Sequence, residues 1–344
     1  MLNYEKIIVR MPNWIGDLVM ATPILHDLRY AFPKAHIAVL CVNPVAQILK
    51  KDPNINQIIT FDRLPKKLDR LRGGEVIEKI SKENFDLGVL LTNSISSAYW
   101  FYKAGVKQRL GFGKGARRVF LNFRAYEPDD IQSRHQVMTY KQILARVGLP
   151  PSSAKPMLYI TKDEKLAVKK FINPKFSKVV GINPGAAYGS AKCWLPKRFA
   201  KVAKDLIDND DEVQVIFFGT QETFKMCEEI CNELGPRVVN LCGKTTIREL
   251  AALISQCKAF LTNDSGPMHM AAAIQVPLLA LFGSTSDVKT GPYQWGEVIH
   301  KHVSCSPCYK RVCPIDFRCM KRISSDEVYD KLLMLVESIP CLND

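Results

Sequence analysis

The chain has 344 residues, of which 47% are hydrophobic and 24% charged, and these proportions exclude a disordered or fibrous protein. The length suffices for two domains with separate cores. No apolar stretch approaches the ~20 residues that cross a bilayer, and the first residues lack the regions of a signal peptide. We therefore expect a cytoplasmic protein.

The formal net charge of +14 is the strongest global signal. It favours an anionic partner, which could be nucleic acid, an anionic membrane surface or a phosphorylated substrate. Lysine and arginine are scattered rather than gathered in one block, and the chain shows no signature of a nucleic-acid-binding module. We therefore expect no nucleic-acid partner.

Short β-branched runs alternate with longer amphipathic stretches, which favours an α/β protein with parallel sheets. Pro23 should interrupt the first helical stretch, because proline lacks the N–H that an inner helical turn needs. In the first half we expect strands at residues 6–10, 36–41, 57–61 and 86–91, and helices at 17–31, 45–50, 75–82 and 95–104.

A Pro- and Ser-rich segment then interrupts the pattern and is the best candidate linker. After it we expect strands at residues 178–183, 212–218, 237–241, 259–262 and 278–282, and helices at 196–208, 221–234, 247–256, 267–274 and 325–337. The predicted organisation is an N-terminal domain over residues 1–150, a linker over 151–156, a C-terminal domain over 157–324, and a helix and tail over 325–344. Ligands of such domains bind at the carboxyl ends of the strands.

The most informative motif runs from residue 262 to residue 273, where an apolar run leads through a polar turn into a helix. Asp264 or Ser265 can cap the helix, and a proline suits its first turn. Gly266 lets another molecule approach the backbone. The free N–H groups and the positive end of the dipole attract phosphate, and His269 could add a donor. An ordinary capped helix is the alternative.

A second motif, at residues 11–17, follows the first predicted strand and contains Asn13 and Trp14. Gly16 permits a tight turn, and Asp17 then stands at a helix start. The Asp17 carboxylate either caps the helix or acts as a general base. The helix dipole would keep it ionised.

A third motif follows the predicted strand at residues 178–183 and offers small residues with a mobile cation. Asn183, Gly185 and Ala186 allow close approach to a ligand, and Lys192 suits a phosphate. A solvated surface loop is the alternative. Thr220 ends another predicted strand with a hydroxyl group. Three such strand ends in one domain fit a nucleotide diphosphate better than any one alone.

These motifs together resemble the ADP-heptose–lipopolysaccharide heptosyltransferases of glycosyltransferase family 9, and most closely their heptosyltransferase II branch. The order and spacing match at Trp14-Ile15-Gly16-Asp17, Thr92-Asn93-Ser94, Arg109-Leu110-Gly111-Phe112, Asn183-Pro184-Gly185-Ala186 with Lys192, and residues 262–269. The resemblance covers nearly the whole chain. It implies a GT-B fold, in which two Rossmann-like domains with parallel sheets face a cleft, with the acceptor in the first domain and the nucleotide sugar in the second.

The resemblance also implies inverting, metal-independent transfer of heptose from ADP-heptose to the lipopolysaccharide core (Kdo/heptose–lipid A) at the cytoplasmic face of the inner membrane. Asp17 would be the base and Lys192 would stabilise the leaving ADP. The donor residues would be Asn183, Gly185, Ala186, Thr220, Asp264, Ser265, Gly266 and His269, and the acceptor residues Asn13, Trp14, Asn93, Ser94, Arg109, Arg117 and Arg118.

Two alternatives remain at this point. Heptosyltransferase I, or a transferase for another ADP-sugar, would use the same kind of site. A basic, non-catalytic nucleic-acid-binding protein would instead bind with a steep salt dependence and would not turn over an ADP-sugar.

Four of the eleven cysteines crowd into one segment as Cys305-x2-Cys308-x4-Cys313-x5-Cys319. Four thiolates there could close a structural zinc site or hold an iron–sulfur cluster. The predicted loop of about forty residues, 283–322, needs a cross-link to be ordered. Free thiols are the alternative, and we expect no cofactor in catalysis.

Overall fold

The computed structural model describes residues 3–63, 73–131 and 133–337. The chain divides into two compact units, Met1–Tyr159 and Ile160–Asp344, and each is treated by itself. The end of the predicted C-terminal tail, residues 338–344, lies outside the described residues.

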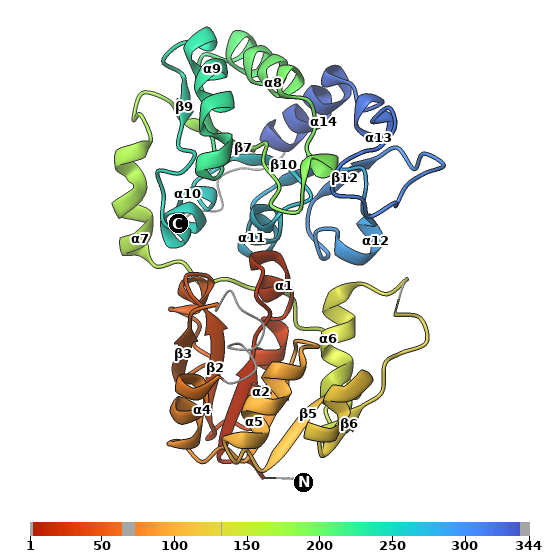
Figure 1. Cartoon of the computed structure of the whole chain (residues 1–344). Helices are drawn as coiled ribbons and strands as arrows, with labels where there is room; N and C mark the ends of the chain where they lie inside the picture. The colour runs from red at the N-terminus through yellow and green to blue at the C-terminus, as the bar shows by residue number, and fades with distance from the viewer. Residues whose placement is uncertain (1–2, 64–72, 132, 338–344) are drawn as a thin grey trace. The chain divides into compact units, whose positions relative to one another are not determined.

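The N-terminal unit is built on a six-stranded sheet with the order β3-β2-β1-β4-β5-β6 (Figure 1). Every pairing between its strands is parallel. Its elements are β1 (Lys6–Arg10), α1 (Ile15–Met20), α2 (Pro23–Ala31), β2 (His36–Val42), η1 (Val45–Leu49), β3 (Gln57–Phe61), α4 (Gly74–Ser81), β4 (Leu87–Leu90), α5 (Ile95–Lys103), β5 (Gln108–Phe112), η2 (Gly115–Phe120), β6 (Phe123–Ala125), α6 (Gln136–Leu144) and η3 (Ala145–Val147).

The C-terminal unit has a second six-stranded parallel sheet, with the order β12-β11-β10-β7-β8-β9. Its elements are α7 (Lys162–Ala167), η4 (Val168–Phe171), β7 (Lys178–Asn183), η5 (Ser190–Lys192), α8 (Pro196–Asn209), β8 (Val213–Phe217), η6 (Gln221–Thr223), α9 (Phe224–Leu234), β9 (Val238–Asn240), α10 (Ile247–Ile254), β10 (Ala259–Asn263), α11 (Gly266–Ile274), β11 (Leu278–Phe282), α12 (Asp287–Thr290), β12 (Glu297–His300), α13 (Arg318–Lys321) and α14 (Ser325–Glu337).

The two sheets have the same doubly wound topology. In each, the first strand of the unit lies at the centre, the next two extend to one side, and the fourth pairs with its other edge. The winding direction therefore reverses between β1 and β4 and again between β7 and β10. The crevice at such a reversal, at the carboxyl ends of the strands, is where doubly wound sheets bind ligands.

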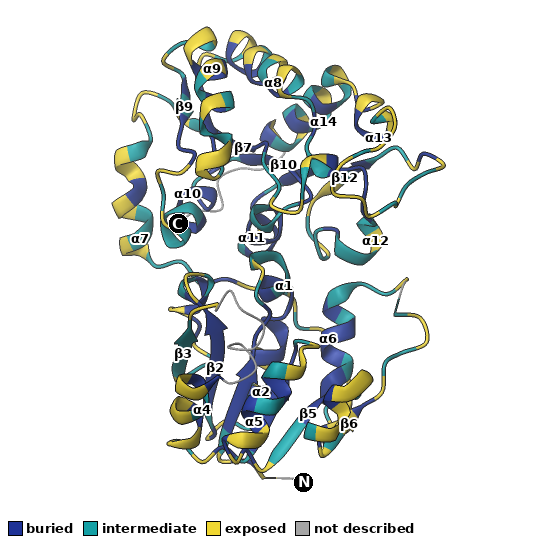
Figure 2. Ribbon diagram, viewed as in Figure 1, coloured by how far each residue is buried: buried dark blue, intermediate teal, exposed yellow. Residues whose placement is uncertain are grey.

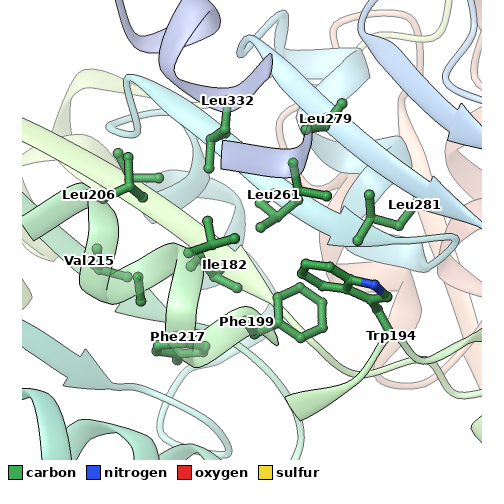
Figure 3. Close-up of a cluster of buried hydrophobic side chains, with 14 of the residues drawn as sticks. Ile182, Trp194, Phe199, Leu206, Val215, Phe217, Leu261, Leu279, Leu281 and Leu332 are labelled. Atoms are coloured by element: carbon green, nitrogen blue, oxygen red, sulfur yellow. The ribbon is translucent and has the colours of Figure 1, made fainter. Parts of the chain in front are cut away.

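The core of each unit lies between its sheet and the covering helices, whose outer faces are exposed (Figure 2). In the C-terminal unit, Trp194 packs edge-to-face on Phe199 with the ring centroids 4.9 Å apart. Leu261 and Leu281, from β10 and β11, belong to the same cluster (Figure 3). Strands buried on both faces read as continuous apolar runs, which is why the central strands could be predicted.

The α/β prediction with parallel sheets is confirmed, and the predicted interruption is seen: α1 ends at Met20 and Pro23 begins α2. The predicted linker at residues 151–156 packs on the N-terminal unit. The Ser152 hydroxyl donates to Asp27 Oδ1 at 2.7 Å, and buried Lys141 donates to the Ser152 carbonyl at 2.8 Å. The unit boundary follows Tyr159.

The predicted forty-residue loop at 283–322 contains regular structure. Strand β12 and the short helices α12 and α13 lie within it. Among the described residues, no helix is both long and apolar enough to span a bilayer.

Candidate active site

The buried side chain of Arg10 fixes the turn after β1 through hydrogen bonds. Its guanidinium donates to Asn13 Oδ1 at 2.5 Å, to the Met11 carbonyl and to Ser97 Oγ at 3.2 Å. Burial lowers the pKa of Arg10 to about 10, so the group stays protonated. Arg10 thus fixes the backbone and the Asn13 amide of the predicted acceptor motif, while Trp14 is exposed.

Asp17 lies in the first turn of α1, half-buried. The Tyr140 hydroxyl, on α6, donates to Asp17 Oδ1 at 3.5 Å. Burial, with the Asp17 charge as a second cause, raises the pKa of Tyr140 well above its usual value. Tyr140 therefore keeps its proton and donates a hydrogen bond to the carboxylate, which orients Asp17 for the role of a general base.

The turn after β4 brings Asn93 and Ser94 to the same edge of the sheet. Ser94 is the N-cap of α5, and its hydroxyl accepts from the Ser97 N–H at 3.3 Å. Asn93 Oδ1 accepts from Arg117 Nη1 at 2.6 Å. Since β1 and β4 are neighbours, Asn13, Asp17, Asn93 and Ser94 all follow strand ends that flank the reversal.

Two of the three predicted acceptor arginines make hydrogen bonds within the protein, although the buried Nε and Nη2 of Arg117 have no partner among the described residues. Arg117 is 1% exposed, and burial lowers its pKa to about 10. It positions Asn93 rather than facing solvent. Arg109 lies near the start of β5, away from the carboxyl edge, and donates to the carbonyls of Val106 at 2.6 Å and Phe120 at 2.7 Å. Arg118 is exposed.

Asn183, at the end of β7, joins the two central strands of the second sheet. Its side-chain amide donates to the Gly185 carbonyl, to Thr262 Oγ1 and to Ser265 Oγ, at 3.1, 3.2 and 3.1 Å. The Thr262 and Ser265 hydroxyls are 2.9 Å apart. The two predicted donor motifs, which follow β7 and β10, are therefore one hydrogen-bonded structure.

Lys192 forms an ion pair in this structure. Its Nζ lies 2.5 Å from Asp264 Oδ2, and the Thr285 hydroxyl donates to the same oxygen at 2.5 Å. The Lys192 side chain is 14% exposed and that of Asp264 is 4% exposed. Asp264 uses one of the three Nζ donors of Lys192, so the remaining donors can serve an anion at the solvent side.

Helix α11 begins at this ion pair. Ser265 stands at its N-cap position but makes no side-chain cap hydrogen bond, because its hydroxyl belongs to the Asn183 network. Gly266 and Pro267 form the first turn, and buried His269 is the fourth residue. A helix start with first-turn N–H groups lacking a side-chain cap and a lysine beside it is suited to a phosphate.

The turn after β8 lies against the turn after β7. A Cβ on Gly185 would lie 3.1 Å from Thr223 Cγ2, and a Cβ on Gly219 would overlap the Thr223 hydroxyl. Both positions therefore need the small residue for this close packing. Thr220 is exposed at the strand end, and Ala186 follows in the same loop as Gly185.

Trp194 anchors the Lys192 loop in the hydrophobic core. Its backbone N–H donates to Asn263 Oδ1 at 3.0 Å, and its indole N–H donates to the Ile323 carbonyl at 3.2 Å. The Asn263 amide donates in turn to the Pro184 carbonyl at 2.6 Å. The lysine loop is thus fixed at both ends.

Several positioning residues were missed by the sequence analysis: Arg10, Tyr140, Thr223, Asn263 and Thr285. Arg10 and Asn263 are the last residues of β1 and β10, and this position at a strand end is the signal that could have found them. The four predicted metal-ligating cysteines line one cavity in the C-terminal unit, as argued below.

The chain was compared with known proteins. Residues 74–317 match the model of glycosyltransferase family 9 (heptosyltransferase). Lipooligosaccharide heptosyltransferase 2 of Campylobacter jejuni is 31% identical over 97% of this chain and 99% of its own. Lipopolysaccharide heptosyltransferase 2 of Escherichia coli K12 is 30% identical over 83% of this chain and 85% of its own.

A solved structure described as E. coli ADP-heptose LPS heptosyltransferase II superposes with a TM-score of 0.81 and 27% identity, covering 97% of this chain and 99% of that one. The matching model covers well over half of the residues, and full-length relatives reach 30% identity or more. The chain therefore belongs to glycosyltransferase family 9, the heptosyltransferases.

Proposed function

We propose that the chain transfers a heptose from ADP-heptose to the inner core of lipopolysaccharide, with inversion and without a metal ion. The observation that carries the proposal is the anion site at the reversal between β7 and β10, where Lys192 adjoins the start of α11. The donor and the class of acceptor are those in the relatives' names. The solved E. coli structure is described as an ADP-heptose LPS heptosyltransferase II, and the E. coli K12 relative is named lipopolysaccharide heptosyltransferase 2.

The C-terminal unit holds the diphosphate of the donor. The first-turn N–H groups of α11 and the Lys192 ammonium meet its oxygens, and Thr220 adds a hydroxyl. As the bond between the sugar and the diphosphate breaks, negative charge grows on the leaving ADP. Fixed donors stabilise that charge without any reorganisation, which is the role a divalent metal fulfils in other transferases. Asp264 and Thr285 hold Lys192 in place.

The N-terminal unit supplies the base. Asp17 accepts the proton of an acceptor hydroxyl as that oxygen forms a bond with the anomeric carbon and ADP leaves. A single displacement of this kind inverts the anomeric centre. Asn13, Trp14, Asn93 and Ser94 contact the acceptor. Arg118 meets its anionic groups, and Arg117 acts through Asn93.

The acceptor carries a lipid, so the enzyme works at the cytoplasmic face of the inner membrane. The net charge of +14 favours contact with an anionic surface. Exposed cations such as Lys114 and Arg118 contribute to this attraction.

The test is incubation with ADP-heptose and two acceptors, Kdo-lipid A and Kdo-lipid A that already carries one heptose, with ADP release as the readout. We expect transfer to the heptose-bearing acceptor. Transfer to Kdo directly would assign heptosyltransferase I activity instead. No ADP release with either acceptor would refute the proposal. NMR of the product gives the anomeric configuration, and retention would refute the single displacement.

A further inference from the structure

Four cysteine side chains line one cavity of about 190 Å³ in the C-terminal unit. They are Cys305, Cys308, Cys313 and Cys319, and none of them forms a disulfide. The cavity lies beside the end of β11 and is closed in part by α13, which carries Cys319. A Cβ on Gly283 would lie 3.1 Å from Cys319 Sγ, so glycine permits the approach of this sulfur.

The charges around the cavity suit a group of thiolates. Arg318 and Lys310 line the cavity as cations. Both cations can partly offset the net negative charge that four thiolates leave on a divalent metal, and Arg318 also donates to Asp316 at 3.0 Å.

An orphaned hydroxyl points to a ligand independently. Ser284 follows β11, lines the same cavity and is 2% exposed. Its Oγ has no hydrogen-bond partner among the described residues. A buried polar atom of this kind requires an explanation. A metal-bound sulfur in the cavity would accept the Ser284 proton.

The nearby Asp287, His300 and His302 are a competing group, since their ligand atoms lie within 4.8 Å of one another. Both nitrogens of His300 are already engaged, with Asp287 Oδ1 at 3.0 Å and Ser306 Oγ at 2.8 Å. Ser306 donates to the Gly283 carbonyl. Because Ser306 lies between Cys305 and Cys308, this network positions the cysteine segment.

The sulfurs are spaced more widely than the ligands of a closed tetrahedral site. In the described chain, no three of them lie within 4.8 Å of one another, whereas metal–sulfur bonds of about 2.3 Å need sulfurs about 3.8 Å apart. A single ion would therefore draw the side chains inward. An iron–sulfur cluster would span a wider set of thiolates.

We propose that Cys305, Cys308, Cys313 and Cys319 bind a thiophilic transition metal, zinc or iron, through their thiolates. Each thiol loses its proton to solvent on binding. The segment at residues 301–317 has neither helix nor strand, so the metal supplies the cross-link that a packed core supplies elsewhere.

The metal-bound segment holds residues 186–192, the donor loop, in place. That this loop binds the donor rests on the proposed function. The Tyr188 hydroxyl donates to the Tyr309 carbonyl at 2.7 Å, and the Ala191 N–H donates to the Arg311 carbonyl at 2.9 Å. A Cβ on Gly189 would collide with that carbonyl. Lys192 follows directly, so order in the cysteine segment is transmitted to the lysine.

The experiment measures zinc, iron and acid-labile sulfide in the full chain purified without oxygen. We expect about one zinc or iron per chain, or several irons with matching sulfide if a cluster is bound. The double variant Cys308→Ser/Cys313→Ser should lose the metal, whereas the controls Cys231→Ser and His302→Ala should keep it. Less than about one-tenth equivalent, as purified and after anaerobic incubation with Zn²⁺ or Fe²⁺, would overturn the proposal. So would a metal that survives in the double variant or leaves in His302→Ala.

Removing the metal from the wild-type chain tests, without a substitution, whether the metal-bound segment orders the donor loop. A chelator should increase hydrogen exchange at residues 305–319 and 186–192. In the double variant, the KM for ADP-heptose should rise several-fold while kcat changes less. An unchanged exchange pattern would refute the support of the donor loop. Metal content needs no transferase activity, so it is decided even if the proposed function fails.

Discussion

Replacing Lys192 with Ala should destabilise the C-terminal unit, because it leaves the buried Asp264 carboxylate without its cation. Asp264 is 4% exposed, and Lys192 and Thr285 share its Oδ2 atom. Removing one partner of a buried ion pair costs about 3–5 kcal/mol. The reverse change, Asp264→Asn, should cost only about 1–2 kcal/mol, since Lys192 keeps access to solvent.

The double variant Lys192→Ala/Asp264→Asn has no unpaired charge, so it should be more stable than Lys192→Ala alone. It also isolates the contact with the ligand. A charge-assisted hydrogen bond contributes about 1.5–3 kcal/mol, so ADP should bind about 10- to 150-fold more weakly. Lys197→Ala, an exposed lysine on α8, is the matched control.

Hydrogen exchange in β10 measures the local stability, and calorimetry measures ADP binding. If Lys192→Ala protects β10 as well as the wild type does, the ion pair is not coupled to folding. If the double variant binds ADP like Lys197→Ala, Lys192 does not contact the diphosphate. Either result would refute the corresponding step of the reasoning.

Three further predictions concern catalysis and pH. Asp17→Asn should lower kcat by about 10²–10⁴ and leave ADP affinity unchanged. The control is Asp211→Asn, which changes an exposed carboxylate. Near wild-type turnover in Asp17→Asn would exclude Asp17 as the base. EDTA should leave kcat nearly unchanged at saturating ADP-heptose, and activity that vanished and returned with magnesium would contradict a metal-independent step. Arg248, whose Nε donates to Glu164 at 2.8 Å, holds the pKa of Glu164 at about 2. The folded pKa lies below the unfolded value of about 4.3, so this stabilisation is complete above pH ~4.3 and is lost as the pH falls through about 2. After discounting for partial exposure, Glu164→Gln should cost about 1–2 kcal/mol at pH 7 and flatten the acid dependence; an unchanged acid limb would contradict this.

The central strands were predictable because their chemistry is local. β7 and β11 are buried on both faces, so each is a short apolar run between turn residues. The sequence analysis missed β5, β6 and β12, and the reason is physical. β6 has only three residues, FRA, β12 contains Glu297 and His300, and β5 contains Gln108 and Arg109. Such strands lack the apolar run that marks a central strand.

Helix α6 was missed because its stabilising contacts are remote in sequence. Lys141 is 1% exposed within it, which no helical pattern would place there. Its ammonium is satisfied by the carbonyls of Ser152 and Ala154. Those acceptors belong to the segment that the composition identified as a linker. Neither feature could be understood from one segment alone.

The same distinction, between local sequence signals and contacts that are remote in sequence, applies to the site residues. Asn183, Asp264 and Ser265 could be chosen as candidates because small polar residues follow strands at the edge where such folds bind ligands, and their role in donor binding stays a prediction. For Arg109, ligand binding stays a prediction, and in the structure three backbone carbonyls accept hydrogen bonds from its guanidinium group. A sequence shows that an arginine is present, but only the folded chain shows whether its donors remain available.

In the proposed reaction, one topology supports opposite electrostatic tasks in the two units. Both sheets have the same strand order, so the turns after β1 and β4 correspond to those after β7 and β10. In the first pair, Asp17 presents a carboxylate supported by a tyrosine that keeps its proton. In the second pair, the carboxylate of Asp264 is buried and holds Lys192, which leaves a cation and helix N–H groups for the proposed diphosphate. In the proposed reaction, the shared fold sets where each ligand binds, and the residues at four turns decide which unit removes a proton and which stabilises an anion.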